Sequence, residues 1–308
     1  MRTKRAKTGN MANLGSRTNL FYVDNLASRL RDYYTLTKPE VNLLILMTTS
    51  AGYYMASRGP LRVPGLINTL VGTLLVASGT ATLNQWMERT WDGQMRRTAR
   101  RPLPAGRVGS REALIFGILL SVTGGVYLAL TVNSLAALLA TFTLLSYLFI
   151  YTPLKRKTPL CTMIGAFPGA MPTLIGWAGA GSVLSRHAWI LFGVLFLWQF
   201  PHFLAIALMY REDYSRAGYH MLPAFDRDAR FTRTEILVFT LALISITSLP
   251  LTGAVGPLYL LGMLLPGAFL LYYVLRLMKS PKTGASGLLH ASVLYLPVVL
   301  TVMMVYRR

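Results

Sequence analysis

Nine apolar stretches, each about the length needed to cross a bilayer as a helix, divide this chain. The hydrocarbon core of a membrane requires about 20 mostly apolar residues per transmembrane helix. No stretch shows the alternating apolar and polar pattern of a β-barrel strand. The expected fold is therefore all-α, a polytopic membrane protein with a bundle of nine transmembrane helices. The stretches lie at 41–57, 65–83, 113–130, 135–151, 161–178, 189–210, 234–251, 259–277 and 288–306.

Composition supports a membrane protein and excludes several other classes. Of 308 residues, 53% are hydrophobic and only 14% are charged, yet the formal net charge is +20. A nucleic-acid-binding protein of this charge would be far more polar, and a soluble enzyme would carry more acidic residues. The apolar content is too high for a disordered chain. With Cys161 as the single cysteine, an intramolecular disulfide or a CxxC metal site is impossible.

The distribution of Lys and Arg predicts the orientation, because cytoplasmic loops carry an excess of both. If the N-terminus is cytoplasmic, 26 of the 31 cationic residues fall on that side of the nine spans. We therefore expect an N-in, C-out topology. Residues 1–40 form a cytoplasmic N-terminal segment, and residues 41–308 form the transmembrane domain. We expect no cleavable signal peptide before the first span. Residues 1–19 are basic and contain no acidic residue, as a transit peptide can be, but we expect a cytoplasmic tail.

All eleven acidic residues also lie on the predicted cytoplasmic side or at its membrane edge. Asn84, Glu88 and Asp92 follow the second span at a spacing of four residues, so they share one face of a helix. One amide and two carboxylates suit a hard cation such as Mg²⁺, which often binds to carboxylates together with substrate phosphates. The equally plausible alternative is a helix end that enters water, with its carboxylates paired to arginines.

Two basic segments follow on the same side. Arg96, Arg97, Arg100 and Arg101 lie within six residues, directly after the carboxylate row. Arginine binds phosphate oxygens in a bidentate manner, but the positive charge of a cytoplasmic loop explains this cluster better on composition alone. The next cytoplasmic loop, 151–159, holds three cations between two prolines. That arrangement suits anion binding as well as ordinary helix orientation.

The sixth span contains a histidine about three helical turns before an acidic exit. An ionisable residue inside a membrane span is a candidate functional residue. His202 and Asp213 are eleven residues apart, so they share a face if the helix continues between them. The alternative is a histidine that is simply hydrogen-bonded in the core. The fifth span, 161–178, is rich in small residues and proline, which indicates close packing or a cavity lining without deciding between them.

Together these segments resemble the UbiA-type intramembrane prenyltransferases, and among them the haem-modifying branch. The resemblance extends from residue 36 to the last span, and four blocks in the same order and on the same membrane face make it specific. They are residues 84–92 with 97–98 and 101–103, residues 151–156, residues 198–202, and residues 213–214 with 216–218 and 221–223.

The resemblance implies a bundle around a cavity that opens to the cytoplasm and binds an isoprenyl diphosphate through Mg²⁺. It assigns the metal to Asn84, Glu88, Asp92 and Asp213. Catalytic roles fall to these four residues with Lys155 and Arg156, and substrate-binding roles fall to Arg96, Arg97, Arg101, Tyr151, His202 and Tyr214. His202 stands where many relatives have the first aspartate of the second motif, which leaves the number of Mg²⁺ ions open. A histidine there fits the haem branch, as an axial ligand, a base or a structural residue.

For that branch the implied reaction is the transfer of a farnesyl group from farnesyl diphosphate to a vinyl group of haem b. Neutralised diphosphate leaves, an allylic carbocation forms in an apolar lumen, the vinyl π-electrons attack it, and water captures the resulting cation. The expected partners are farnesyl diphosphate, haem b and the lipid bilayer, with a downstream haem-modifying enzyme as a candidate and no nucleic acid.

Two alternative functions are retained. A related prenyltransferase could act on a quinone or chlorophyll precursor, although the block 198–202 argues against it. A cation-coupled transporter would place charged residues along a path through the membrane, whereas here the acids cluster at one face. We expect a bacterial inner membrane rather than an organelle membrane, because the chain has little length beyond its nine spans.

Overall fold

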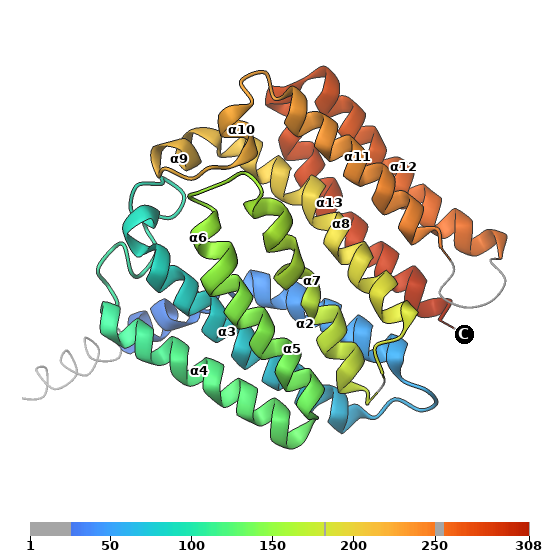
Figure 1. The fold of residues 1–308 in the computed structure, drawn as a ribbon, viewed down its shortest axis with the longest axis horizontal. Helices are drawn as coiled ribbons and strands as arrows, with labels where there is room; N and C mark the ends of the chain where they lie inside the picture. Colours follow the sequence, from blue (N-terminus) through green and yellow to red (C-terminus); the bar gives the residue numbers. More distant parts are fainter. Residues whose placement is uncertain (1–25, 182, 250–255, 308) are drawn as a thin grey trace, which may run out of the picture.

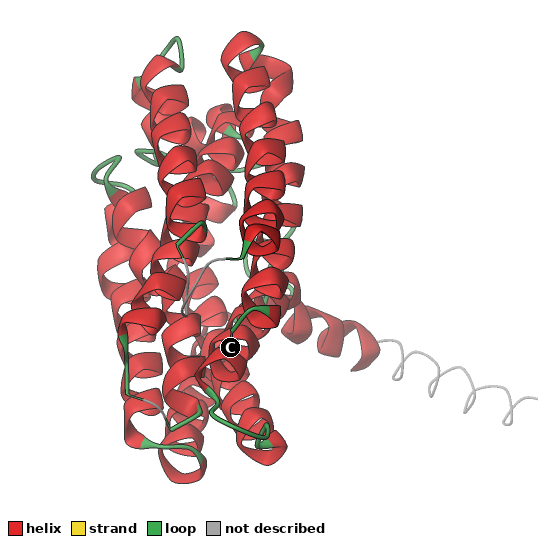
Figure 2. Cartoon of the chain, turned by 90° about the vertical axis from the view of Figure 1, so that its right-hand side faces the viewer, coloured by secondary structure: helices red, strands yellow, loops and turns green. Residues whose placement is uncertain are grey.

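The computed structural model describes residues 26–181, 183–249 and 256–307, and these residues form helices and loops without a strand (Figure 2). Two short helices, α9 (Arg211–Arg216) and α10 (Leu222–Phe225), lie between longer ones. The longer helices are α2 (Pro39–Ala56), α3 (Val63–Asp92), α4 (Ser110–Thr131), α5 (Ser134–Leu145) continued by the π-helix η1 (Ser146–Tyr151) and α6 (Thr152–Leu154), α7 (Cys161–Gly179), α8 (Arg186–Met209), α11 (Arg230–Thr247), α12 (Pro257–Lys279) and α13 (Pro281–Val305).

Each of the nine apolar stretches coincides largely with one long helical segment of the described chain, which confirms the all-α fold. Residues 250–251, at the end of the seventh stretch, lie outside the described residues. Six helical segments are long and apolar enough to cross a membrane, namely α3, α4, α5 to α6, α8, α12 and α13. The nine spans and their orientation therefore remain predictions.

The loops that carry most of the polar residues gather at one end of the bundle. Figure 1 shows α9, α10, α6 and the loop after α3 at the upper left, whereas the links from α2 to α3 and from α7 to α8 lie toward the opposite end. Direct contacts join these polar loops: the His220 amide donates to the Lys155 carbonyl at 2.7 Å, and the Arg156 guanidinium lies 4.3 Å from the Trp91 ring centroid. The arrangement brings together residues from distant parts of the sequence.

Small residues allow the helices beneath this end to approach closely. Gly52 of α2 lies against the backbone of Thr173 in α7, and Gly176 of α7 lies against the backbone of Thr49 in α2. In both places a Cβ atom would collide with main-chain atoms. The small residues of the fifth apolar stretch therefore serve close helix packing, one of the two functions that the sequence left open.

The helix formed by residues 26–36 packs beside the start of α4 rather than standing free. Leu36 is fully buried in a cluster with Leu103, Val108 and Ala113. On the surface, Arg107 forms an ion pair with Asp32 at 2.9 Å. The end of the N-terminal segment is thus attached to the loop after α3, whereas residues 1–25 lie outside the described residues.

Adjacent glycines in α4 provide a test of this packing. A Cβ on Gly124 would lie 2.7 Å from the Val76 backbone nitrogen of α3, whereas a Cβ on Gly125 would meet only the Thr141 hydroxyl at 3.8 Å. We expect Gly124→Ala to lower the free energy of unfolding by about 1–3 kcal/mol through overpacking. Gly125→Ala is the matched control and should be neutral or slightly stabilising. Thermal unfolding of both purified variants in detergent would measure the difference, and equal melting temperatures would contradict the packing.

Candidate active site

The second apolar helix continues two and a half turns beyond its predicted end and carries the carboxylate row with it. Asn84, Glu88 and Asp92 belong to the last turns of α3, and their exposed fractions are 1%, 5% and 1%. The shared helix face is confirmed, but the row does not enter water as a helix end would. Burial of two carboxylates in an apolar bundle requires compensating charge.

Lys155 provides that charge for Glu88. Its ammonium group lies 2.9 Å from Glu88 Oε1, and both side chains are almost completely enclosed. Burial opposes the charged form of Lys155, but the Glu88 carboxylate and the neighbouring tyrosine hydroxyls together outweigh it, so the pKa of Lys155 lies above its ordinary value. The same ammonium group lies 4.6 Å from the ring centroid of Tyr151. Two predicted catalytic residues and one predicted binding residue thus meet at one point.

Arg101 provides the charge for Asp92. Its guanidinium donates to Asp92 Oδ2 at 2.8 Å, with Asp92 buried and Arg101 about one quarter exposed. The Thr98 hydroxyl donates to the Asp92 carbonyl at 2.7 Å and holds the turn that returns the loop to α3. Arg101 therefore forms a specific ion pair and does not only contribute to the positive charge of the loop.

Lys38 is a further cation of the site, and it was not among the predicted site residues. Its ammonium group donates to Asn84 Oδ1 at 2.9 Å. Its backbone is left-handed, with φ 52° and ψ 65°, immediately before Pro39, a conformation that is strained for a residue other than glycine. Burial and the neighbouring cations Arg101 and Lys155 lower the pKa of Lys38 to about 7. The signal in the sequence was a single lysine before a proline at the entrance to the first span.

The second acidic segment lies at the rim of the site. Asp213 of α9 accepts hydrogen bonds from the Arg97 backbone at 3.4 Å and from the Arg216 side chain at 3.1 Å. The Arg97 side chain donates to the Tyr214 hydroxyl at 3.1 Å and lies over the Tyr210 ring. The structure therefore connects Asp213, Arg97 and Tyr214 across the loops after α3 and α8.

Tyr219, on the same loop, was also missed by the sequence analysis. Only 4% of the residue is exposed. Burial and the Glu88 carboxylate raise the pKa of Tyr219, so its hydroxyl group stays protonated beside the carboxylate. Of the remaining predicted residues, Arg156 lies over Trp91 at the surface, and Arg96 is exposed.

The condition for a common face of His202 and Asp213, one continuous helix between them, is not met. Helix α8 ends at Met209, and Tyr210 (φ −109°, ψ 26°) separates it from α9, so the helix does not continue to Asp213. His202 Nδ1 lies 2.9 Å from the Ser292 hydroxyl of α13, and its ring stacks on Trp198 with centroids 4.6 Å apart. The structure thus places His202 in a packing contact between α8 and α13.

The predicted metal ligands are oxygen donors of the right type, but they face cations here. No three acidic, histidine or cysteine side chains of the described residues lie close enough together to hold one metal ion. Glu88 and Asp92 are each bound to a basic side chain, and Asp213 lies on a different helix. If the basic side chains bound an anion, their carboxylate partners would become free to bind a metal ion.

Comparisons with known proteins assign the chain to a family. The sequence model of the UbiA prenyltransferase family matches residues 45–294, most of the chain. The chain belongs to the UbiA prenyltransferase family. It is 48% identical to a protoheme IX farnesyltransferase of Solibacter usitatus, over 90% of this chain and 99% of that protein. It is 41% identical to a protoheme IX farnesyltransferase of Salinibacter ruber, over 90% of this chain and 98% of that protein.

Solved structures share the UbiA fold. A digeranylgeranylglyceryl phosphate synthase superposes with a TM-score of 0.74 at 20% identity, over 91% of this chain and 99% of that one. A UbiA homolog from Archaeoglobus fulgidus bound to GPP and Mg²⁺ superposes with a TM-score of 0.66 at 16% identity, over 88% of this chain and 99% of that one. At these identities the likeness establishes the fold alone.

The buried pair of this UbiA protein generates a stability prediction. Lys155→Met should lower the free energy of unfolding by about 3–5 kcal/mol, because Glu88 would remain as an unpaired buried charge. Adding Glu88→Gln to Lys155→Met removes that charge and should restore most of the loss. Thermal unfolding in detergent would measure both variants, with Lys157→Met, at an exposed position of the same loop, as the control. An unchanged melting temperature for Lys155→Met would contradict the buried ion pair.

Proposed function

We propose that this UbiA protein transfers a farnesyl group from farnesyl diphosphate to a vinyl group of haem b and releases diphosphate. The enzyme crosses the membrane nine times, with residues 1–40 and the polar loops on the cytoplasmic side and the domain 41–308 in a bacterial inner membrane. The product, a haem with a hydroxyethylfarnesyl group, passes to a downstream haem-modifying enzyme. The alternative within the family is the prenylation of a quinone or chlorophyll precursor.

The observation that carries the proposal is the buried row on α3 and its cations. Asn84, Glu88 and Asp92 each face a basic side chain, at 2.9, 2.9 and 2.8 Å, at the polar end of an apolar bundle. A prenyl diphosphate has a matching division, with an anionic head and a long apolar chain. The relatives named protoheme IX farnesyltransferase, which align over nearly their whole length, support haem b as the acceptor.

The side chains of the row fit a magnesium ion by their chemistry. Mg²⁺ prefers carboxylate and other oxygen ligands and commonly shares them with substrate phosphates. Asn84, Glu88 and Asp92 would hold it, with Asp213 as the ligand contributed by α9. When bound, Mg²⁺ would neutralise negative charge on the departing diphosphate. The Archaeoglobus fulgidus homolog bound to GPP and Mg²⁺ supports this assignment.

The basic residues of the chain would bind the diphosphate itself. Lys155 and Arg101 leave their carboxylates and face phosphate oxygens, and Arg97, Arg96 and Arg156 complete the charge at the rim. Positive groups that are already oriented stabilise charge on a leaving group more effectively than mobile water does. The C1–O bond of the farnesyl group then breaks, and the diphosphate departs with the electron pair.

The allylic cation that forms must be kept from water until the acceptor reacts. The rings of Tyr147 and Tyr151 lie near Lys155, at 5.9 and 4.6 Å from its ammonium group, and can face the cation with their π-electrons. A vinyl group of haem b donates its π-electrons to C1 of the farnesyl group and forms a new C–C bond. Water adds to the resulting cation and loses a proton, which gives the hydroxyl group.

The acceptor can be identified directly. Membranes that contain the protein should convert haem b and farnesyl diphosphate into a product heavier by one farnesyl group and one hydroxyl group. Mass spectrometry of the extracted haems would measure this conversion. Prenylation of an aromatic quinone precursor, with haem b unchanged, would assign the protein to the alternative reaction.

Substitutions in the row should separate activity from folding. We expect Glu88→Ala or Asp92→Ala to reduce turnover by more than about a hundredfold, because the groups that would hold Mg²⁺ stabilise charge in the transition state. Removal of divalent cations with EDTA should have the same effect, and added Mg²⁺ should reverse it. Glu112→Gln is the control, since this carboxylate lies at the same end of the bundle but is half exposed and paired with Arg29. Full turnover by Glu88→Ala would contradict the metal assignment.

A further inference from the structure

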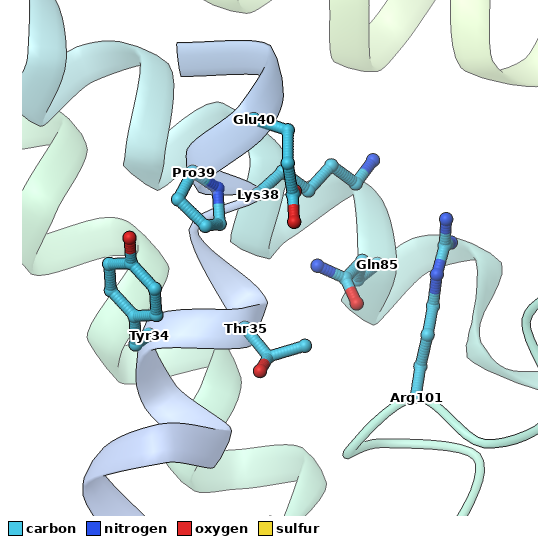
Figure 3. Close-up of a pocket in the computed structure, with 7 residues that line it drawn as sticks. All are labelled: Tyr34, Thr35, Lys38, Pro39, Glu40, Gln85 and Arg101. Atoms are coloured by element: carbon cyan, nitrogen blue, oxygen red, sulfur yellow. The ribbon is translucent and has the colours of Figure 1, made fainter. Parts of the chain in front are cut away.

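A polar pocket of about 220 Å³ lies next to the site described above and shares Lys38 and Arg101 with it. The end of the N-terminal helix, the first turn of α2, the last turns of α3 and the loop after α3 line it (Figure 3). In Figure 3 the side chain of Lys38 extends to the right and that of Arg101 extends upward, and both end on the same side of the view as the Gln85 amide, opposite Tyr34. The lining residues are Tyr34, Thr35, Lys38, Pro39, Glu40, Gln85 and Arg101.

Two cations, Lys38 and Arg101, and one exposed carboxylate, Glu40, line this pocket. Lys155 is paired with Glu88 and Arg101 with Asp92. No carboxylate of the described residues lies within ion-pair distance of Lys38, whose ammonium group binds the amide oxygen of Asn84 instead. Because an ammonium group has three donors, Lys38 can accept an anionic partner without losing Asn84. The pocket thus has room for an anion beside a lysine that has no carboxylate partner among the described residues.

The backbone at Lys38 adopts a strained conformation that orients its side chain. A left-handed conformation at a residue other than glycine costs about 1–3 kcal/mol and persists where the surrounding structure determines it. The conformation of Lys38, with φ 52°, directs the side chain between Asn84 and the pocket. A residue that only filled space could adopt the extended backbone preferred before proline.

Gln85 provides an independent sign of a missing polar occupant. Its exposed fraction is 1%, and its amide nitrogen donates to the Leu36 carbonyl at 2.8 Å. Its Oε1 atom has no partner among the described residues, although it is buried beside the pocket. An unpartnered buried acceptor costs about 1–3 kcal/mol. A water molecule that hydrates a bound anion would satisfy it.

We propose that this pocket binds one carboxylate of the acceptor, a propionate side chain of haem b, at the ammonium group of Lys38. The inference rests on the proposed function and adds a second anion site to it. Glu40, which also lines the pocket, would repel a diphosphate more strongly than a singly charged carboxylate. A carboxylate is therefore the better ligand. The volume accommodates a propionate with its hydration and excludes the tetrapyrrole ring. The tetrapyrrole ring would then lie outside the pocket, and its edge opposite the propionates would face the bundle.

The test compares haem b with its dimethyl ester, in which both propionates are neutral, for the full-length enzyme in detergent. We expect the ester to raise the KM of the wild type for the acceptor about tenfold or more, as the loss of one charged hydrogen bond does. Lys38→Met should raise the KM for haem b by a similar factor. In Lys38→Met, the ratio of the KM for the ester to the KM for haem b should be about tenfold smaller than in the wild type. The KM for farnesyl diphosphate should change less than about twofold, and Lys38→Arg should recover most of the loss.

Controls separate this proposal from folding and from the proposed function. Arg100→Ala removes an exposed cation next to Arg101 and should leave both KM values unchanged. Size-exclusion chromatography and thermal unfolding would verify that Lys38→Met is folded, and Lys38→Arg provides a second folded variant for comparison. The proposal would be overturned if Lys38→Met raised the KM for farnesyl diphosphate. It would also be overturned if the wild type and Lys38→Met discriminated equally against the ester. In both cases the proposed function would stand as long as the wild type converts haem b. A wild type that does not react with haem b would overturn both.

Discussion

Burial of carboxylates at the end of an apolar helix is the constraint on which the rest of this site depends. Glu88 and Asp92 are almost inaccessible to solvent, and each would be strongly destabilising without a cation at hydrogen-bond distance. The cations come from elsewhere in the chain: Lys155 from the end of the fourth helical segment, and Arg101 from the loop after α3. Compensation of these two charges therefore fixes the positions of two loops above the bundle and closes its polar end.

The same ion pairs contain the groups that a diphosphate and a divalent cation would need. Cations that neutralise carboxylates in the free protein are the groups that a diphosphate needs, and the carboxylates they would release are the ligands that a divalent cation needs. An exchange of partners on substrate binding leaves no charge unpaired. In the function proposed above, this exchange would take place where the apolar bundle meets its basic rim. A substrate with an anionic head and an apolar tail would then be oriented by both parts of the protein.

Much of the site could be predicted because its determinants are local. The spacing of Asn84, Glu88 and Asp92 places them on one helix face wherever that helix packs, and the structure confirms it. The alignment of His202 with Asp213 failed because it required an uninterrupted helix, and Tyr210 ends α8 before Asp213 is reached. Lys38 and Tyr219 could not be ranked above other lysines and tyrosines, since their importance depends on contacts with Asn84 and Glu88 that are 46 residues or more away in sequence.

By itself the sequence determined that the chain is an all-helical protein with long apolar segments, because hydropathy and helical periodicity are properties of contiguous segments. The resemblance of four sequence blocks indicated the UbiA family. Only the tertiary structure decided which cation faces which carboxylate, that the small residues of α7 serve close packing against α2, and that Lys38 lies between Asn84 and a second polar pocket. These are pairings between distant segments, and they follow from the way the helices pack and the charges compensate one another.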